Sequence, residues 1–129
     1  GAHVLVLEDD RDARQALHEL FDDWGVMYSS GATLEELMRD SASSELDVDA
    51  IVTDYRLPGA RNGAECIVEL RRALETDAPA IIVTGEGDLA PIGKSLPGRT
   101  TLLQKPFETR ALATPLIAAI RLARGAEGA

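Results

Sequence analysis

The sequence predicts an α/β fold with three layers: a five-stranded parallel sheet covered by helices on both faces. Short apolar and β-branched runs alternate five times with segments whose apolar residues recur at helical spacing. Most of the short runs are continuously apolar, which is typical of parallel strands buried on both faces. The chain has 129 residues, 45% of them apolar, enough for one core and too few for two. We therefore expect a single domain over residues 1–129, with its core in about 3–124.

Five segments are predicted to be strands. The third, residues 50–54, is apolar up to its last residue, Asp54, and Pro58 and Gly59 turn the chain soon afterwards. The other four strands are expected at residues 4–7, 26–28, 80–83 and 101–104.

The first three helices follow from apolar spacing and from their ends. The first carries a stripe that should lie in the core, and Gly25 ends it. Thr33 is expected to cap the second, with Glu36 completing a capping box, through about Arg39 and before a polar loop at 40–49. The third follows Asn62. The apolar stripes of the first and third helices are Ala13, Ala16, Leu17, Leu20, Phe21 and Trp24, and Ile67, Leu70 and Leu74.

The last two helices are less regular. The segment 85–99 contains two prolines and several glycines, so the fourth helix should be short or distorted. For the fifth, two starts fit the sequence. Either Thr109 caps it and Pro115 lies inside, or the regular helix begins at Thr114 with Pro115 in its first position. Residues 125–129 should fray.

Composition narrows the class of protein. The net charge of −9 gives no footprint for nucleic acid but suits divalent cations or a basic partner surface. No apolar run has the length of a membrane span, and the N-terminal residues lack a signal-peptide pattern. The single cysteine, Cys66, flanks an apolar helix face and is expected to be a buried, unreactive thiol. These features predict a cytoplasmic domain without membrane contact.

Polar side chains follow four of the predicted strands. Glu8 and Asp9 follow the first, Asp54 ends the third, Thr84 follows the fourth and Lys105 the fifth. Ligands of open parallel sheets bind beyond the carboxyl ends of the strands, so these side chains should meet at one edge.

Converging carboxylates repel one another unless a cation lies among them, and Mg2+ prefers oxygen ligands. Asp9 and Asp54 could each supply one carboxylate oxygen, and the backbone carbonyl of Arg56 a third. Glu8 could hold a metal-bound water. A carboxylate beside Mg2+ can attack a phosphoryl group, which makes Asp54 the expected acceptor.

The remaining strand-end residues would stabilise the phosphoryl oxygens. Lys105 offers an ammonium and Thr84 a hydroxyl, and Lys105 should also pair with Asp54. Pro106 could follow a cis peptide bond. Each signal alone is weak, because acids near strand ends are more often turn residues or helix caps. Their coincidence at one edge favours a Mg2+-dependent phosphoryl-acceptor site.

In this pattern the chain resembles the receiver domains of response regulators in two-component signalling. The resemblance covers nearly the whole chain and rests on Glu8-Asp9, Asp54, Thr84 and Lys105-Pro106-Phe107 in order. It implies a flavodoxin-like (CheY-like) fold with strand order 2-1-3-4-5 and five helices. It implies phosphoryl transfer to Asp54 from a phosphohistidine of a histidine kinase or histidine phosphotransfer domain, with Mg2+ on Asp9, Asp54 and the Arg56 carbonyl. Homodimer formation is left open.

The chain departs from the family in its output region. The family's switch aromatic lies three residues before the lysine, where this chain has Leu102, and the fourth helix is interrupted. These departures resemble receivers attached to hybrid sensor histidine kinases, whose domains pass phosphoryl groups on or tune the kinase.

Three rival functions account for parts of this pattern. A small Mg2+-dependent aspartyl phosphatase would want an acid two residues after its nucleophile, where this chain has Arg56. A phosphorylation-independent pseudo-receiver would not need the complete set of acids, threonine and lysine. A flavodoxin-type cofactor binder would not place Glu8 and Asp9 where its phosphate must lie. The sequence therefore favours a non-enzymatic phosphoacceptor.

Overall fold

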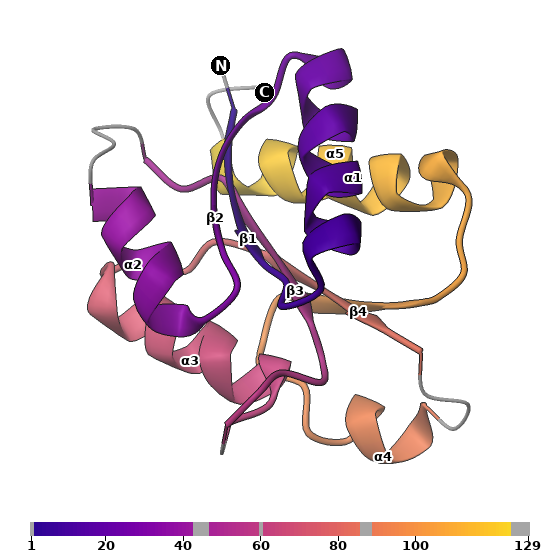
Figure 1. Cartoon of the computed structure of the whole chain (residues 1–129). Coiled ribbons are helices and arrows are strands. Elements are labelled where there is room, and N and C mark those ends of the chain that lie inside the picture. Colours follow the sequence, from indigo (N-terminus) through magenta and orange to yellow (C-terminus); the bar gives the residue numbers. More distant parts are fainter. Residues whose placement is uncertain (1, 43–46, 60, 86–88, 125–129) are drawn as a thin grey trace.

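A computed structural model describes residues 2–42, 47–59, 61–85 and 89–124. Five parallel strands form one sheet in the order β2-β1-β3-β4-β5, and five helices alternate with them along the chain (Figure 1). The predicted fold and strand order are confirmed. The elements are β1 (His3–Leu7), α1 (Arg11–Trp24), β2 (Met27–Gly31), α2 (Leu34–Ala42), β3 (Ala50–Asp54), α3 (Gly63–Ala73), β4 (Ala80–Thr84), α4 (Ala90–Gly93), β5 (Thr100–Gln104) and α5 (Thr109–Arg124).

The sheet separates two apolar clusters. Side chains alternate between the faces of each strand, so successive strand residues join different clusters. One cluster joins the sheet to α2 and α3 through Leu37, Ile67 and Leu70. The other joins it to α1 and α5 through Phe21 and Leu112. The helices thus cover both faces, as the continuous apolar strands required.

The first helix begins and ends at the expected kinds of residue. The Asp10 side chain accepts a hydrogen bond from the backbone N–H of Ala13 and caps the N-terminus. Gly25 ends the helix with φ 69°, and its N–H donates to the carbonyls of Asp22 and Phe21. Phe21 is fully buried and Trp24 packs against the same cluster, so both belong to the core as predicted.

The second strand is longer than predicted. It covers Met27–Gly31 rather than residues 26–28, and it pairs with β1 as far as Leu7 opposite Gly31. The sequence did not predict this continuation, because Ser29 and Ser30 are residues typical of loops. Their hydroxyls lie 2.8 Å from histidine ring nitrogens, Ser29 from His3 and Ser30 from His18. These hydrogen bonds satisfy the serines within the strand.

The second helix also runs further than predicted, to Ala42 instead of about Arg39. The start of the segment predicted as a polar loop is therefore helical, and residues 43–46 lie outside the described residues. Thr33 accepts from the N–H of Glu36 as expected. The Glu36 carboxylate, however, accepts from the N–H of Ala32 rather than completing a capping box with Thr33.

The fourth and fifth helices settle two expectations. The fourth is only four residues long, with Pro91 in its first turn, so the prediction of a short helix is confirmed. The fifth begins at Thr109 itself, which is the first helical residue rather than the cap, and it contains Pro115, so the alternative with Pro115 inside the helix is found. The predicted fraying at 125–129 lies outside the described residues. Among the helices described, none is long and apolar enough to cross a membrane.

Candidate functional site

Four strands deliver the predicted side chains to one edge of the sheet. Glu8 and Asp9 directly follow β1, Asp54 is the last residue of β3, and Thr84 is the last residue of β4. Lys105 follows β5, and its backbone N–H donates to the Thr84 carbonyl at 2.7 Å. Because all neighbouring pairs are parallel, these ends share one edge.

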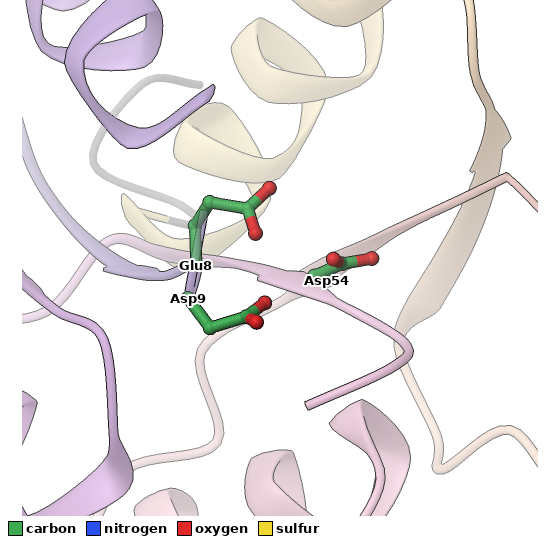
Figure 2. A group of neighbouring side chains, drawn as sticks. All are labelled: Glu8, Asp9 and Asp54. Carbon is green, nitrogen blue, oxygen red and sulfur yellow. The ribbon is translucent and has the colours of Figure 1, made fainter. Parts of the chain in front are cut away.

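Three carboxylates meet at this edge. Glu8, Asp9 and Asp54 each place one oxygen within 4.8 Å of the others, an arrangement that can hold a metal ion (Figure 2). Glu8 is only 3% exposed, whereas Asp9 is exposed. In Figure 2 the Glu8 side chain extends toward α1 and α5, whereas that of Asp9 leaves the backbone on another side, with its carboxylate toward Asp54. The two neighbouring acids thus have different surroundings.

The Lys105 ammonium lies between two of these acids. Its Nζ is 3.3 Å from Glu8 Oε1 and 3.6 Å from Asp54 Oδ2. The predicted pairing with Asp54 is therefore present, but the shorter contact is with Glu8. The peptide bond between Lys105 and Pro106 is cis.

The close charges shift the pKa values of two groups. Burial raises the pKa of Glu8 to about 7, and the negative charge of Asp54 adds to this, while Lys105 opposes it. Burial acts to lower the pKa of Lys105, but Glu8 and Asp54 outweigh it and the net shift is upward. At neutral pH the Lys105 side chain therefore stays protonated, and the Glu8 carboxyl is only partly ionised.

The backbone of Asp54 is held by the start of α3. Gly63 donates its N–H to the Tyr55 carbonyl at 2.7 Å. A Cβ at Gly63 would lie 2.2 Å from the carbonyl oxygen of Asp54, so only glycine permits this approach. Asn62 and Glu65 form a full capping box at the same helix end. These contacts hold the backbone around Asp54 against the N-terminus of α3.

The other predicted residues occupy the same edge. Thr84 is fully buried at the end of β4. Arg56 is exposed and lies in the bend two residues after Asp54. Cys66, by contrast, is buried within α3, and burial raises the pKa of its thiol, so the prediction of an unreactive cysteine is supported.

One residue at the site was not predicted. Arg14 of α1 donates from Nη1 to the backbone carbonyl of Glu8 at 2.8 Å, which ties the acidic segment to the first helix. Asp10 contributes as well, because its N–H donates to Glu8 Oε2 at 3.2 Å. One sequence signal could have predicted this contact. Arg14 is a cationic residue in the first turns of the helix that follows the acidic segment.

Comparisons with known proteins agree with this geometry. The response regulator receiver domain family matches residues 4–117. The transcriptional regulatory protein FixJ of Bradyrhizobium diazoefficiens is 32% identical over 131 residues, covering 96% of this chain and 59% of its own length. The C4-dicarboxylate transport transcriptional regulatory protein DctD of Pseudomonas aeruginosa is 32% identical over 123 residues, 94% of this chain and 26% of its own. This chain therefore spans between about a quarter and three-fifths of these relatives.

Solved structures give the same fold. Vibrio cholerae chemotaxis protein CheY4 matches with a TM-score of 0.76 and 25% identity, covering 92% of this chain and 98% of that one. The receiver domain of the hybrid histidine kinase CckA matches with a TM-score of 0.74 and 20% identity, covering 93% and 100%, which supports the fold alone. From the family match, the relatives and the site, we conclude that this chain belongs to the response regulator receiver domains of two-component signalling.

Proposed function

We propose that Asp54 is the phosphoacceptor of this receiver domain and that the resulting acyl phosphate modulates a partner or the parent protein. One observation carries the proposal. The Asp54 carboxylate lies at a sheet edge with two further carboxylates within 4.8 Å and the Lys105 ammonium at 3.6 Å. The Asp54 nucleophile thus lies beside carboxylate oxygens that can bind a cation. It also lies beside an ammonium that can stabilise the charge of a phosphoryl group.

In the proposed step, an Oδ atom of Asp54 attacks phosphorus and the bond to the donor nitrogen breaks. The leaving imidazole keeps the bonding electron pair and becomes neutral histidine once protonated. Lys105 stabilises the charge on the phosphoryl oxygens. To do so, its ammonium moves away from the ion pairs with Glu8 and Asp54. Thr84 supplies a hydroxyl to the same oxygens after a local shift, because it is fully buried before the reaction.

A divalent cation, Mg2+ in this proposal, would be held by Asp9, Asp54 and the backbone carbonyl of Arg56, with Glu8 acting through water. When bound, it would neutralise the carboxylates and the incoming phosphoryl charge. The donor set fits this ion, since it consists of oxygens only.

The wider assignments belong to the same proposal. The receiver unit comprises residues 1–129 with its core in about 3–124, acts as a phosphoacceptor rather than an enzyme, and works in the cytoplasm. Its partner is a histidine kinase or a histidine phosphotransfer domain, and its acidic surface does not contact nucleic acid or membrane. The hybrid-kinase origin stays a prediction, since FixJ and DctD are by name transcriptional regulators.

The test is intact mass after incubation with acetyl phosphate and Mg2+. We expect one phosphate adduct of about 80 Da in the wild type, none in Asp54→Asn and none in chelator. Asp47→Asn serves as the matched control, because it changes an exposed acid remote from the site. An adduct that persists in Asp54→Asn contradicts the acceptor assignment. If a cognate phosphohistidine also gives no adduct with folded wild type, the pseudo-receiver alternative replaces the proposal.

A further inference from the structure

A cavity that the proposed function does not use borders the site between α1 and the start of α5. It has a volume of about 460 Å³, within the range of about 300–1,000 Å³ typical of small-molecule sites. Exposed residues such as Asp10, Ala16 and Thr109 contribute to its lining, so the cavity is a recess of ligand size that opens to the surface.

The interior of the cavity is apolar. Helix α1 lines it with two alanines and two leucines, and strands β1, β3 and β4 and the segment before α5 add further apolar side chains. The apolar lining that the argument uses is Ala13, Leu17, Leu20, Val52, Val83 and Phe107. Small side chains on α1 leave the space open, and larger ones would fill it. Such walls favour an aromatic or branched aliphatic body.

The lining of the cavity also carries charge. Among the described residues that line it are the acids Glu8, Asp10 and Asp54 and one cation, Lys105. The Glu8 side chain extends toward α1 and α5, on the side of this cavity (Figure 2). Even with Arg14, which donates to the Glu8 carbonyl, the three acids outnumber the cations. In the metal-free protein, the charge of this part of the lining therefore complements a cation.

From this combination we propose that the α1–α5 cavity binds a small organic cation, an aromatic or branched aliphatic amine or amidine. Its apolar body occupies the cavity, and its charged group donates to the carboxylates of Glu8 and Asp54. Charge-assisted hydrogen bonds of this kind are about twice as strong as neutral ones. Because the same carboxylates would hold Mg2+, the organic cation and the metal exclude one another.

Occupancy would also affect phosphorylation. A charged group beside Asp54 and Lys105 covers the nucleophile and replaces the metal, so the bound amine slows phosphoryl transfer. This effect rests on the proposed function of Asp54, whereas the binding itself does not. Failure of phosphorylation and failure of amine binding are therefore separate outcomes.

The probe is 1-naphthylmethylamine, with 1-naphthalenemethanol as its neutral twin. Binding is followed by amide chemical shifts of isotope-labelled protein without metal. We expect saturable shifts at Val52 and Phe107 and at least tenfold weaker binding of the alcohol. Saturating Mg2+ should weaken amine binding at least threefold. Equal affinity of amine and alcohol, or indifference to Mg2+, would overturn the proposal.

Filling the cavity gives the second arm. Ala13→Leu narrows the recess and should weaken amine binding at least tenfold, and Ala16→Leu provides an independent filling variant from the same helix. Ala118→Leu is the matched control, because Ala118 is exposed on α5. Binding unchanged in both filling variants, with folding confirmed by their spectra, would refute the site. A second result would also refute the site. If the wild type forms a concentration-dependent dimer and the filling variants abolish it, the cavity receives a second copy of the chain instead of an amine.

Discussion

The two faces of the sheet are packed differently. On one face, α3 buries five of its 11 residues, and it contacts α2 directly. On the other face, α1 has 14 residues and buries only Phe21, because the cavity runs alongside it. Both helices are amphipathic, so the difference does not come from their patterns. The acidic edge therefore has one tightly packed side, at Gly63, and one side that borders the cavity, at the buried Glu8.

The largest expected effect compares leucines on the two faces. Leu70 is fully buried in α3, and Leu70→Ala should lower the free energy of unfolding by about 3 kcal/mol through lost burial and a new cavity. Leu17 of α1 is half-buried and already borders open space, so Leu17→Ala should cost about 1 kcal/mol. Urea unfolding of both variants measures this. Equal losses would mean that the α1 face is packed as tightly as the α3 face.

The next effect is the pH dependence of folding stability that Glu8 creates on the side that borders the cavity. Its pKa is about 7 in the folded protein against an ordinary value of 4.5, so the folded state binds this proton more tightly than the unfolded chain does. The stabilisation is complete below about pH 4.5 and is lost as the pH rises through about 7. We expect a loss on the order of 2 kcal/mol in metal-free buffer.

Chemical denaturation between pH 5 and pH 8 in the presence of a chelator measures this loss. Glu8→Gln removes the titrating group and should flatten the profile over this interval, whereas Glu19→Gln alters an exposed acid of the same region and should leave it unchanged. Parallel profiles for wild type and Glu8→Gln would contradict the assignment to Glu8.

The smallest effect is the difference in stability between two alanine-to-leucine substitutions, one on each face of the sheet. Ala64→Leu forces a larger side chain against the tight face, where Ala64 is 5% exposed, and should cost about 2 kcal/mol. Ala13→Leu enlarges a side chain that lines the cavity and should change stability by less than about 1 kcal/mol in either direction. Thermal melts with matched buffers test the pair. A large loss in Ala13→Leu would show that the α1 face has no room.

Sequence reasoning succeeded where the signals were local. Continuous apolar runs located the five strands, and parallel pairing then required Asp54, Thr84 and Lys105 to share an edge. It failed where a polar residue was satisfied by a distant partner. The hydroxyls of Ser29 and Ser30 lie at hydrogen-bond distance from histidines of other elements, and nothing near them in the sequence announced a strand.

The site divides in the same way. The sequence by itself determined which groups gather at the acidic edge, because strand ends and their polar residues follow from patterns a few residues long. Only the tertiary structure decided that Lys105 lies closer to Glu8 than to Asp54 and that Arg14 holds the Glu8 carbonyl. It also decided that α1 leaves a cavity beside α5. These features depend on how helices settle against the sheet, which is set by the summed packing of side chains far apart in the chain.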